Sequence, residues 1–441
     1  MILIALLMLA FGLRLHDLGA KSLWSDEGLT LRRAEQPIAL VFKNVIPIGP
    51  DYQDGAELEV VSTPDLHPPL YFLLMHVWIR WTGKSEFLLR FPSLVAATLS
   101  LPLLYVLGRS LMSREAGLWA ALLGATSPFF LWYAQEARMY SWLVVLSLAS
   151  VYAFLSLLKD RPRRREYVVF VVVTLALLYT HYAGFLLLAF EALAYAMLRL
   201  RTRRREVLIT LGVVAAALIP LAPFAWRALH VRAFSFTHRP LLSILREASS
   251  SFSLGPSPSA VQPLWLLSPF LLFLGVGVLM LDVVNRRRAW VIGLGYLILP
   301  ILIQFGLSFV KPNYMNPRHL MTVAPAWELM VAQGLTTLRR RCWPALVIAL
   351  SFALFFRGQA NHDILTSHRF WKDDIRGAVQ YIEARARPGD AIVLHHPVIR
   401  LTFDYYYRGS CPEIVIPGYG NNDDTEQARR RFAEWAQRYD R

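Results

Sequence analysis

The sequence predicts an all-α polytopic membrane protein that carries a small α/β domain at its C-terminus. Of its 441 residues only 17% are charged and 55% are hydrophobic, whereas about 25% of residues are charged in ordinary soluble domains. The apolar residues form long uninterrupted runs, and a run of about 18 or more can cross a bilayer. Short arginine-rich clusters separate the runs, and this distribution orients helices by keeping basic residues in the cytoplasm.

Eleven apolar segments are candidate transmembrane helices, and they cover residues 1–15, 88–108, 116–133, 139–158, 166–180, 183–199, 207–226, 263–284, 289–309, 318–337 and 343–357. The first is interpreted as a retained span because no small-residue cleavage site follows it. The basic clusters between the segments must all face one side of the membrane. This condition places the N-terminus in the cytoplasm and the residues after 357 outside it.

Residues 68–82 are apolar enough to look like a twelfth span, but the basic clusters exclude a crossing here. A crossing would put Arg109 and Arg114 outside the cell, or would reverse the N-terminus. The segment is also short and contains His76 and Arg80. We therefore expect a juxtamembrane helix that is embedded in the membrane or lies at its interface without crossing.

Two polar regions flank the spans. The first is the extracytoplasmic loop of residues 16–87, which contains WSDEG (24–28) and, before the embedded helix, DLHPPL (65–70). The second begins after residue 357, where the pattern predicts helices at 371–386 and 425–440 and strands at 391–396 and 413–417. Alternation of helices and strands favours a parallel sheet. We expect a catalytic membrane domain over 1–357 and an extracytoplasmic α/β domain, incomplete at its end, over 358–441.

The net charge of +15 does not indicate nucleic-acid binding, because membrane topology already explains the basic clusters. The two cysteines, Cys342 and Cys411, fall on opposite sides of the membrane in this topology and cannot form a disulfide. They indicate no redox or metal site.

Candidate reactive residues gather at the outer face. Asp26 and Glu27 stand at the outer end of the first span, where a carboxylate can act as a general base. Equally, Asp26 could cap a helix that follows. His67 precedes two prolines and is typical of a helix start, although an imidazole there could also bind phosphate, a carboxylate or a metal. The residue types of Asp26, Glu27 and His67 allow a divalent ion, but their spacing is no metal signature.

Two outer turns carry further charges. Glu136 and Arg138 could form a surface ion pair, or could act as a second acidic group and a phosphate-binding guanidinium. Arg318 and His319 could bind phosphate, or could reach from the end of a span to the membrane interface. Glu191 and Glu328 lie inside spans and are expected to pair structurally.

Acidic groups, cationic groups and an embedded apolar helix at one membrane face suit transfer from a polyprenyl-phosphate sugar. The leaving phosphate gains negative charge, which Arg or His can stabilise. A carboxylate can activate the acceptor from the opposite face of the sugar, which implies inversion at the anomeric carbon.

Six ordered motifs resemble the bacterial members of the dolichyl-phosphate-mannose protein mannosyltransferase family, including the aminoarabinose transferases, which have the GT-C glycosyltransferase fold. The motifs are LWSDEG (23–28), HPPLYFLL (67–74), GKSEFLLRFPSL (83–94), YAQEARMYSW (133–142), YTHYAGF (179–185) and NPRHLMTVAPA (316–326). The resemblance they carry extends over roughly residues 1–360, and the ordered set is more specific than any single piece.

The resemblance implies roles for individual residues. Asp26 matches the position taken as the catalytic carboxylate, with Glu27 beside it, and Glu136 matches the acidic residue of the second outer turn. Arg138 and Arg318 match phosphate-facing basic positions. His67, His319, His181 and Tyr182 lie within the same motifs and are expected to bind substrate.

The implied function is that of an inverting hexosyl- or pentosyltransferase in the inner (plasma) membrane, with a polyprenyl-phosphate sugar donor and a lipid, glycan or protein acceptor. The inserted carbohydrate-binding domain of the eukaryotic family members is absent, which argues against protein O-mannosylation. A transporter or lipid flippase is the alternative from another class, although the sequence shows no internal repeat of the kind transporters carry. A scaffold protein that binds partners through its C-terminal domain is a third reading.

Overall fold

The computed structural model describes residues 1–43, 46, 67–223, 226, 239–256, 263–279, 286–310, 316–370, 372–395, 397–416, 429–430, 433 and 437. The chain divides into two compact units. Unit 1 consists of Met1–His16 and Phe91–Phe370, and unit 2 consists of Asp17–Arg90 and Trp371–Arg441. Most of the helix expected over 425–440 lies outside the described residues.

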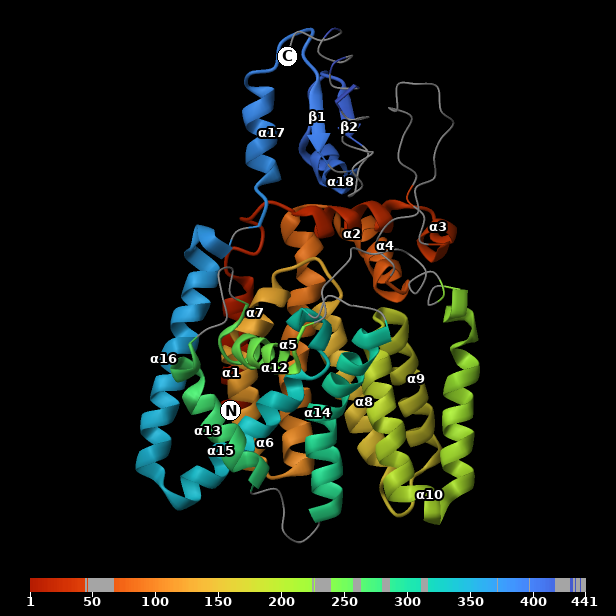
Figure 1. The fold of residues 1–441 in the computed structure, drawn as a ribbon, viewed down its shortest axis with the longest axis vertical. Coiled ribbons are helices and arrows are strands. Elements are labelled where there is room, and N and C mark those ends of the chain that lie inside the picture. Colours follow the sequence, from red (N-terminus) through yellow and green to blue (C-terminus); the bar gives the residue numbers. More distant parts are fainter. Residues whose placement is uncertain are drawn as a thin grey trace. The chain divides into compact units, whose positions relative to one another are not determined.

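Unit 1 is helical throughout its described part. Its elements are α1 Ile2–Leu15, α5 Glu86–Leu111 from Phe91 onward, α6 Arg114–Thr126, α7 Pro128–Ala134, α8 Tyr140–Leu157, α9 Arg164–Thr180, α10 Gly184–Ala217, η1 Ile219–Leu221, α12 Leu241–Leu254, α13 Leu264–Leu279, α14 Arg286–Val310, η2 Pro317–Leu320, α15 Ala324–Arg341, α16 Trp343–Thr366 and η3 His368–Phe370. Figure 1 shows these helices along the chain.

Four helices of the described part are long and apolar enough to cross a membrane, namely Glu86–Leu111, Tyr140–Leu157, Trp290–Phe309 and Trp343–Thr366. Two shorter apolar helices are Ile2–Leu15 and Trp265–Leu279. The predicted class, an all-α polytopic membrane fold, is confirmed. The count of eleven spans and their orientation stay predictions.

Some helices differ from the sequence expectation. The segment expected as one span over 116–133 is two helices, α6 and α7, divided at Ser127. Pro128 has no N–H to continue the hydrogen-bond ladder, and the Ser127 hydroxyl caps α7 by accepting from the Phe130 N–H at 3.4 Å. The basic segment after residue 199 is continuous with its neighbours in α10, which has a kink at Arg203. The loop expected over 227–262 contains α12.

The break after α6 leaves its last carbonyls without helical donors, and buried side chains of two other helices supply them. Arg14 of α1 donates to the carbonyls of Gly124 and Ala125 at 2.9 and 3.3 Å. From α16, Arg357 donates to the Leu123 carbonyl at 2.7 Å, and Asn361 donates to the Thr126 carbonyl at 2.9 Å. Because unpaired carbonyls are costly inside a membrane, these side chains stabilise the interrupted helix.

Glu191 and Glu328, the carboxylates expected to pair inside spans, are both hydrogen-bonded. Glu328 of α15 receives two bonds from the Arg357 guanidinium, at 2.9 and 3.1 Å. Arg357 also donates to the Ser253 carbonyl at the end of α12. Glu191 of α10 accepts from the Ser150 hydroxyl of α8 at 2.8 Å. These contacts tie α8 to α10, and α16 to α12 and α15.

Unit 2 combines the first polar loop with the C-terminal segment. Its elements are α2 Ser25–Glu35, α3 Ile38–Lys43, α4 Leu70–Thr82, the first turn of α5, α17 Ile375–Glu383, β1 Ile392–His395, α18 Pro397–Tyr406 and β2 Glu413–Ile416. The segment expected not to cross forms α4, which has 13 residues, whereas a span needs about 20. In Figure 1 the red and orange helices α2 to α4 and the blue C-terminal elements belong to this unit.

The strands expected at 391–396 and 413–417 form a two-stranded parallel sheet, with Ile392 opposite Glu413 and Leu394 opposite Val415. Val379 of α17 and Phe403 of α18 are buried in the same core as Ile392 and Leu394. The sheet therefore has helices packed against it, as the alternating pattern predicted. The sequence did not indicate α18.

The boundary predicted at residue 357 falls inside α16, which continues to Thr366. Contacts group residues 17–90 with the C-terminal segment rather than with the helices of unit 1. Leu401 of α18, for example, is buried against Leu29 of α2 and Ile46. The assignment of a catalytic membrane domain and an α/β domain stays a prediction. Both cysteines, Cys342 and Cys411, are free thiols.

Candidate active site

Asp26 stands in the first turn of α2. Trp24, with extended backbone angles, is the N-cap residue, so Asp26 is not the helix cap. The third residue of the helix, Glu27, makes the capping contact by accepting from the Trp24 backbone N–H at 3.4 Å. The Asp26 side chain is only partly buried, and it lies near the positive end of the helix dipole, which favours a carboxylate.

Glu27 forms a buried, two-pronged ion pair with Arg90. The Arg90 Nε and Nη2 atoms donate to the two carboxylate oxygens at 2.8 and 2.7 Å, and the two residues are 3% and 1% exposed. Arg90 also donates to the backbone carbonyls of Leu18, Lys21 and Ser22 at 2.9 to 3.0 Å. All five N–H donors of its guanidinium are thus used to fix the segment that leads into α2.

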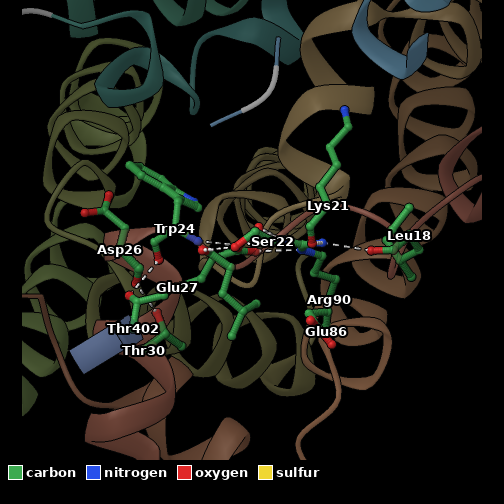
Figure 2. Close-up of polar contacts among 12 residues, drawn as sticks. Leu18, Lys21, Ser22, Trp24, Asp26, Glu27, Thr30, Glu86, Arg90 and Thr402 are labelled. Carbon is green, nitrogen blue, oxygen red and sulfur yellow. Dashed lines mark hydrogen bonds and ion pairs between the residues drawn. The ribbon is translucent and has the colours of Figure 1, made fainter. Parts of the chain in front are cut away.

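Figure 2 shows the consequence for the two adjacent carboxylates. The Glu27 side chain points to Arg90, whereas the Asp26 carboxylate points away from this pair. The catalytic role expected for Glu27 stays a prediction, and its contacts are those of a residue that positions its neighbour. Sequence reasoning missed Arg90, although it lies in the GKSEFLLRFPSL motif.

His67 is held by the same helix that carries Asp26. Arg33 of α2 donates to the His67 and Val41 carbonyls at 3.0 and 3.1 Å, and its guanidinium lies 3.8 Å from the centre of the Phe72 ring. Arg33 follows Asp26 by seven residues, about 10 Å along the helix axis. Through this contact, α2 joins the Asp26 turn to the start of α4.

No group of three or more His, Cys, Asp or Glu side chains suited to hold a metal occurs among the described residues. Within the set expected from the sequence, both oxygens of Glu27 are bound by Arg90. The carboxylate of Asp26 and the imidazole of His67 remain suitable donor types.

The predicted residues Glu136 and Arg138 lie in unit 1, in the turn between α7 and α8. Each is only 3% exposed, so both side chains are buried rather than at a surface. The Ser93 hydroxyl of α5 donates to the Arg138 carbonyl at 3.1 Å. Gln135 donates to the carbonyl of His16 at 2.7 Å. The turn is therefore fixed by contacts from α5 and from the end of α1.

A chain of rings connects this turn to the turn that carries His181 and Tyr182. The Tyr140 ring centre lies 5.0 Å from Tyr133 and 6.0 Å from His181. The Nδ1 atom of His181 accepts from the Ala183 N–H at 2.9 Å. In a neutral ring the proton is then on Nε2, so His181 can act there as a donor.

Arg318 and His319 belong to η2, where both are partly buried. The Asn316 side chain caps this short helix by accepting from the Arg318 N–H at 3.0 Å. Lys311, which the sequence places nearby, lies outside the described residues. Unit 1 thus contains Glu136, Arg138, His181, Tyr182, Arg318 and His319, whereas unit 2 contains Asp26, Glu27 and His67.

Comparison with known proteins agrees with the resemblance in the motifs. Residues 66–226 match the family described as dolichyl-phosphate-mannose-protein mannosyltransferase. Among curated proteins, none matches the chain significantly by sequence.

Solved structures match over almost the whole chain. The ArnT protein of Cupriavidus metallidurans in its apo state is 14% identical, with a TM-score of 0.62 over 99% of this chain and 88% of that chain. The same protein bound to undecaprenyl phosphate is 15% identical, with a TM-score of 0.58 and coverage of 98% and 88%.

The archaeal oligosaccharyltransferase AglB of Archaeoglobus fulgidus, in complex with an inhibitory peptide and a dolichol-phosphate, is 14% identical. Its TM-score is 0.58, with coverage of 98% of this chain and 68% of that chain. The resemblance stated from the sequence is confirmed: the chain has the GT-C fold of these membrane proteins, and its residues 66–226 match the dolichyl-phosphate-mannose-protein mannosyltransferase family.

Proposed function

We propose that the chain is an inverting glycosyltransferase that moves a sugar from a polyprenyl-phosphate donor to an extracytoplasmic acceptor. The observation that carries this proposal is the separation of roles in the first turn of α2. Arg90 holds Glu27, whereas the Asp26 carboxylate points away from that pair. A carboxylate presented on a fixed backbone suits a general base, because proton transfer requires a positioned group.

In the proposed reaction, Asp26 takes the proton from the acceptor hydroxyl or amine. The acceptor oxygen or nitrogen then bonds to the anomeric carbon as the bond from that carbon to the phosphate oxygen breaks. The polyprenyl phosphate leaves with the bonding electron pair, and the configuration at the anomeric carbon is inverted. We propose that Arg138, Arg318 and His67 stabilise the negative charge that the phosphate gains, because guanidinium and imidazole groups stabilise such charge.

The remaining expected residues are assigned supporting roles. Glu136 is the second acidic group of the site, and His181, Tyr182 and His319 are proposed to bind the sugar or phosphate. The relatives support a lipid-linked donor, since one was solved with undecaprenyl phosphate and another with a dolichol-phosphate and a peptide. The transfer assay described below distinguishes a hexose from a pentose donor. The proposed acceptor is a lipid, a glycan or a protein.

We propose further that the protein lies in the inner (plasma) membrane, with the N-terminus in the cytoplasm and the C-terminal domain outside. A divalent ion near Asp26 and His67 is the remaining cofactor hypothesis. Its test is the addition of a chelator to the transfer assay, because a required ion would make turnover recover only when a divalent cation is restored.

The function is tested by supplying detergent-purified protein with a panel of labelled polyprenyl-phosphate hexoses and pentoses, together with membrane lipid extract as acceptor. We expect transfer, or slow hydrolysis without acceptor, from one donor class, and a product whose anomeric configuration is opposite to that of the donor. A product with retained configuration would contradict the proposed mechanism. Movement of labelled lipid across reconstituted vesicles without any transfer would favour the flippase alternative.

A further inference from the structure

The C-terminal segment contacts the segment that carries Asp26 at several points within unit 2. The Arg376 backbone N–H of α17 donates to the Ser22 hydroxyl at 3.1 Å. The Lys372 ammonium lies 4.0 Å from the centre of the Trp24 ring. α18 packs along α2, where Leu401 meets Leu29. These contacts reach both the loop before the Asp26 turn and the helix after it.

Tyr406, at the end of α18, makes the most specific of these contacts. Its hydroxyl accepts from the Leu23 backbone N–H at 2.8 Å and donates to Glu86 Oε1 at 2.9 Å. Glu86 also accepts from Arg376 Nη1 at 3.1 Å. Burial raises the pKa of the Tyr406 hydroxyl, so it stays protonated at neutral pH and can keep both bonds.

The Leu23 contact is directly relevant to the Asp26 turn. Leu23 is fully buried, and it precedes the N-cap residue Trp24. Arg90 binds the Ser22 carbonyl at 2.9 Å, and Tyr406 binds the Leu23 N–H of the same peptide group. The orientation of the turn is therefore determined from two sides, by Arg90 of α5 and by Tyr406, which follows Leu23 by 383 positions in the sequence.

Gly28 shows how closely α18 approaches α2. A Cβ atom at Gly28 would lie 2.0 Å from the Thr402 Oγ1 atom and 2.9 Å from its Cβ. Thr402 is fully buried, and its hydroxyl donates weakly to the Trp24 carbonyl at 3.4 Å. The two helices therefore fit together only because residue 28 has no side chain.

We propose that Tyr406 is a positioning residue for Asp26, and that the C-terminal segment completes the scaffold of the active site instead of acting as a separate binding module. The expected effect on catalysis rests on the proposed function. The structural part of the proposal, the fixing of residues 22–30 by Tyr406, can be measured without any substrate.

The test compares Tyr406→Phe with Tyr405→Phe. The matched control removes a neighbouring hydroxyl, which donates to the Lys84 carbonyl at 2.9 Å. We expect Tyr406→Phe to lower kcat for transfer about tenfold, because the Leu23 N–H loses its hydrogen bond to the Tyr406 hydroxyl. KM for the donor should stay within about twofold. In an Asp26→Asn background the same change should have no further effect on the residual rate, because a positioning residue acts only through the group it positions.

Amide hydrogen exchange provides the second measurement. We expect faster exchange in the peptide covering residues 22–30 of Tyr406→Phe, and unchanged exchange there in Tyr405→Phe. Equal exchange and equal kcat in the two variants would overturn the proposal. If the wild type turns over no donor, the proposed function fails, and the exchange result alone decides whether Tyr406 fixes the Asp26 turn.

The packing of Gly28 gives an independent prediction. Alanine is a better helix former than glycine, yet we expect Gly28→Ala to lower kcat about 100-fold, because the Cβ displaces the Asp26 turn. Thr402→Gly removes the atoms that the new Cβ would meet first. The double variant should therefore recover part of the lost activity, although Thr402→Gly alone is neutral or harmful. Activity of the double variant no higher than that of Gly28→Ala would contradict the predicted clash.

Discussion

Asp26→Asn is expected to lower kcat for sugar transfer by about 10²- to 10⁴-fold, the usual contribution of a general base. Asparagine has nearly the same shape as aspartate but cannot take a proton from the acceptor. The fold should be unaffected, because Trp24 is the N-cap residue and the Glu27 side chain makes the capping contact. Initial rates with the accepted donor check the expected loss of kcat, and thermal unfolding of the purified variant checks that the fold is unaffected.

Glu35→Gln is the matched control, since it removes a carboxylate from the other end of the same helix. Glu35 pairs with Lys84 at 2.6 Å in a partly exposed contact, and ion pairs open to solvent contribute little. We expect its transfer rate to stay within about twofold of the wild type. If Asp26→Asn retained comparable activity, another group would have to serve as the base, and Glu136 would be the next candidate.

Arg90→Met is expected to destabilise the protein by about 3–5 kcal/mol, the usual cost of leaving one partner of a buried ion pair alone. The change leaves the Glu27 carboxylate and three backbone carbonyls without their shared donor. Arg90→Lys should rescue little of this loss, because an ammonium cannot make the two-pronged contact or reach all three carbonyls. Thermal unfolding in detergent, measured with transfer activity, gives both effects.

A double-mutant cycle with Glu27→Gln separates the ion pair from the carbonyl contacts. The double variant should be less destabilised than the sum of the single variants, because each single change already breaks the same pair. Lys84→Met, which breaks the exposed pair with Glu35, should cost less than about 1 kcal/mol. If the losses of unfolding free energy in Arg90→Met and Glu27→Gln simply added up in the double variant, the two side chains would not stabilise the fold through their mutual contact.

Local patterns predicted much of the fold. The strands expected at 391–396 and 413–417 match β1 and β2, because β-branched residues between turn signals form a local pattern. The short segment with His76 and Arg80 is α4, which the charge distribution had excluded as a span. The helix α12, by contrast, was overlooked in a region interpreted as loop, although Leu and Ile side chains repeat there with helical spacing.

The contacts that fix the site could not be predicted, because they join residues distant in the sequence. Glu27 and Arg90 are 63 positions apart, and nothing in the motif distinguishes Arg90 from a basic residue at the membrane interface. Apart from the family resemblance, the sequence does not distinguish Asp26 from Glu27 as the reactive carboxylate. Only the three-dimensional structure shows that Glu27 meets Arg90 while Asp26 points away from this pair. It also shows that α18 packs closely against Gly28.

The pair of Glu328 and Arg357 has a consequence for how the chain is inserted into the bilayer during synthesis. An arginine at the centre of a helix costs about 2.5–3.5 kcal/mol on translocon insertion scales. An 18-residue stretch of α16 has a mean hydropathy of 1.3, the lowest among the four helices that are long and apolar enough to cross a membrane, and α15 is not one of these four. Only Cys342 separates the two helices, so they can leave the translocon as one hairpin in which each charge neutralises the other. The ion pair is then needed already during membrane insertion, before any substrate is bound. A change to either residue should reduce the amount of inserted protein, whatever its effect on turnover.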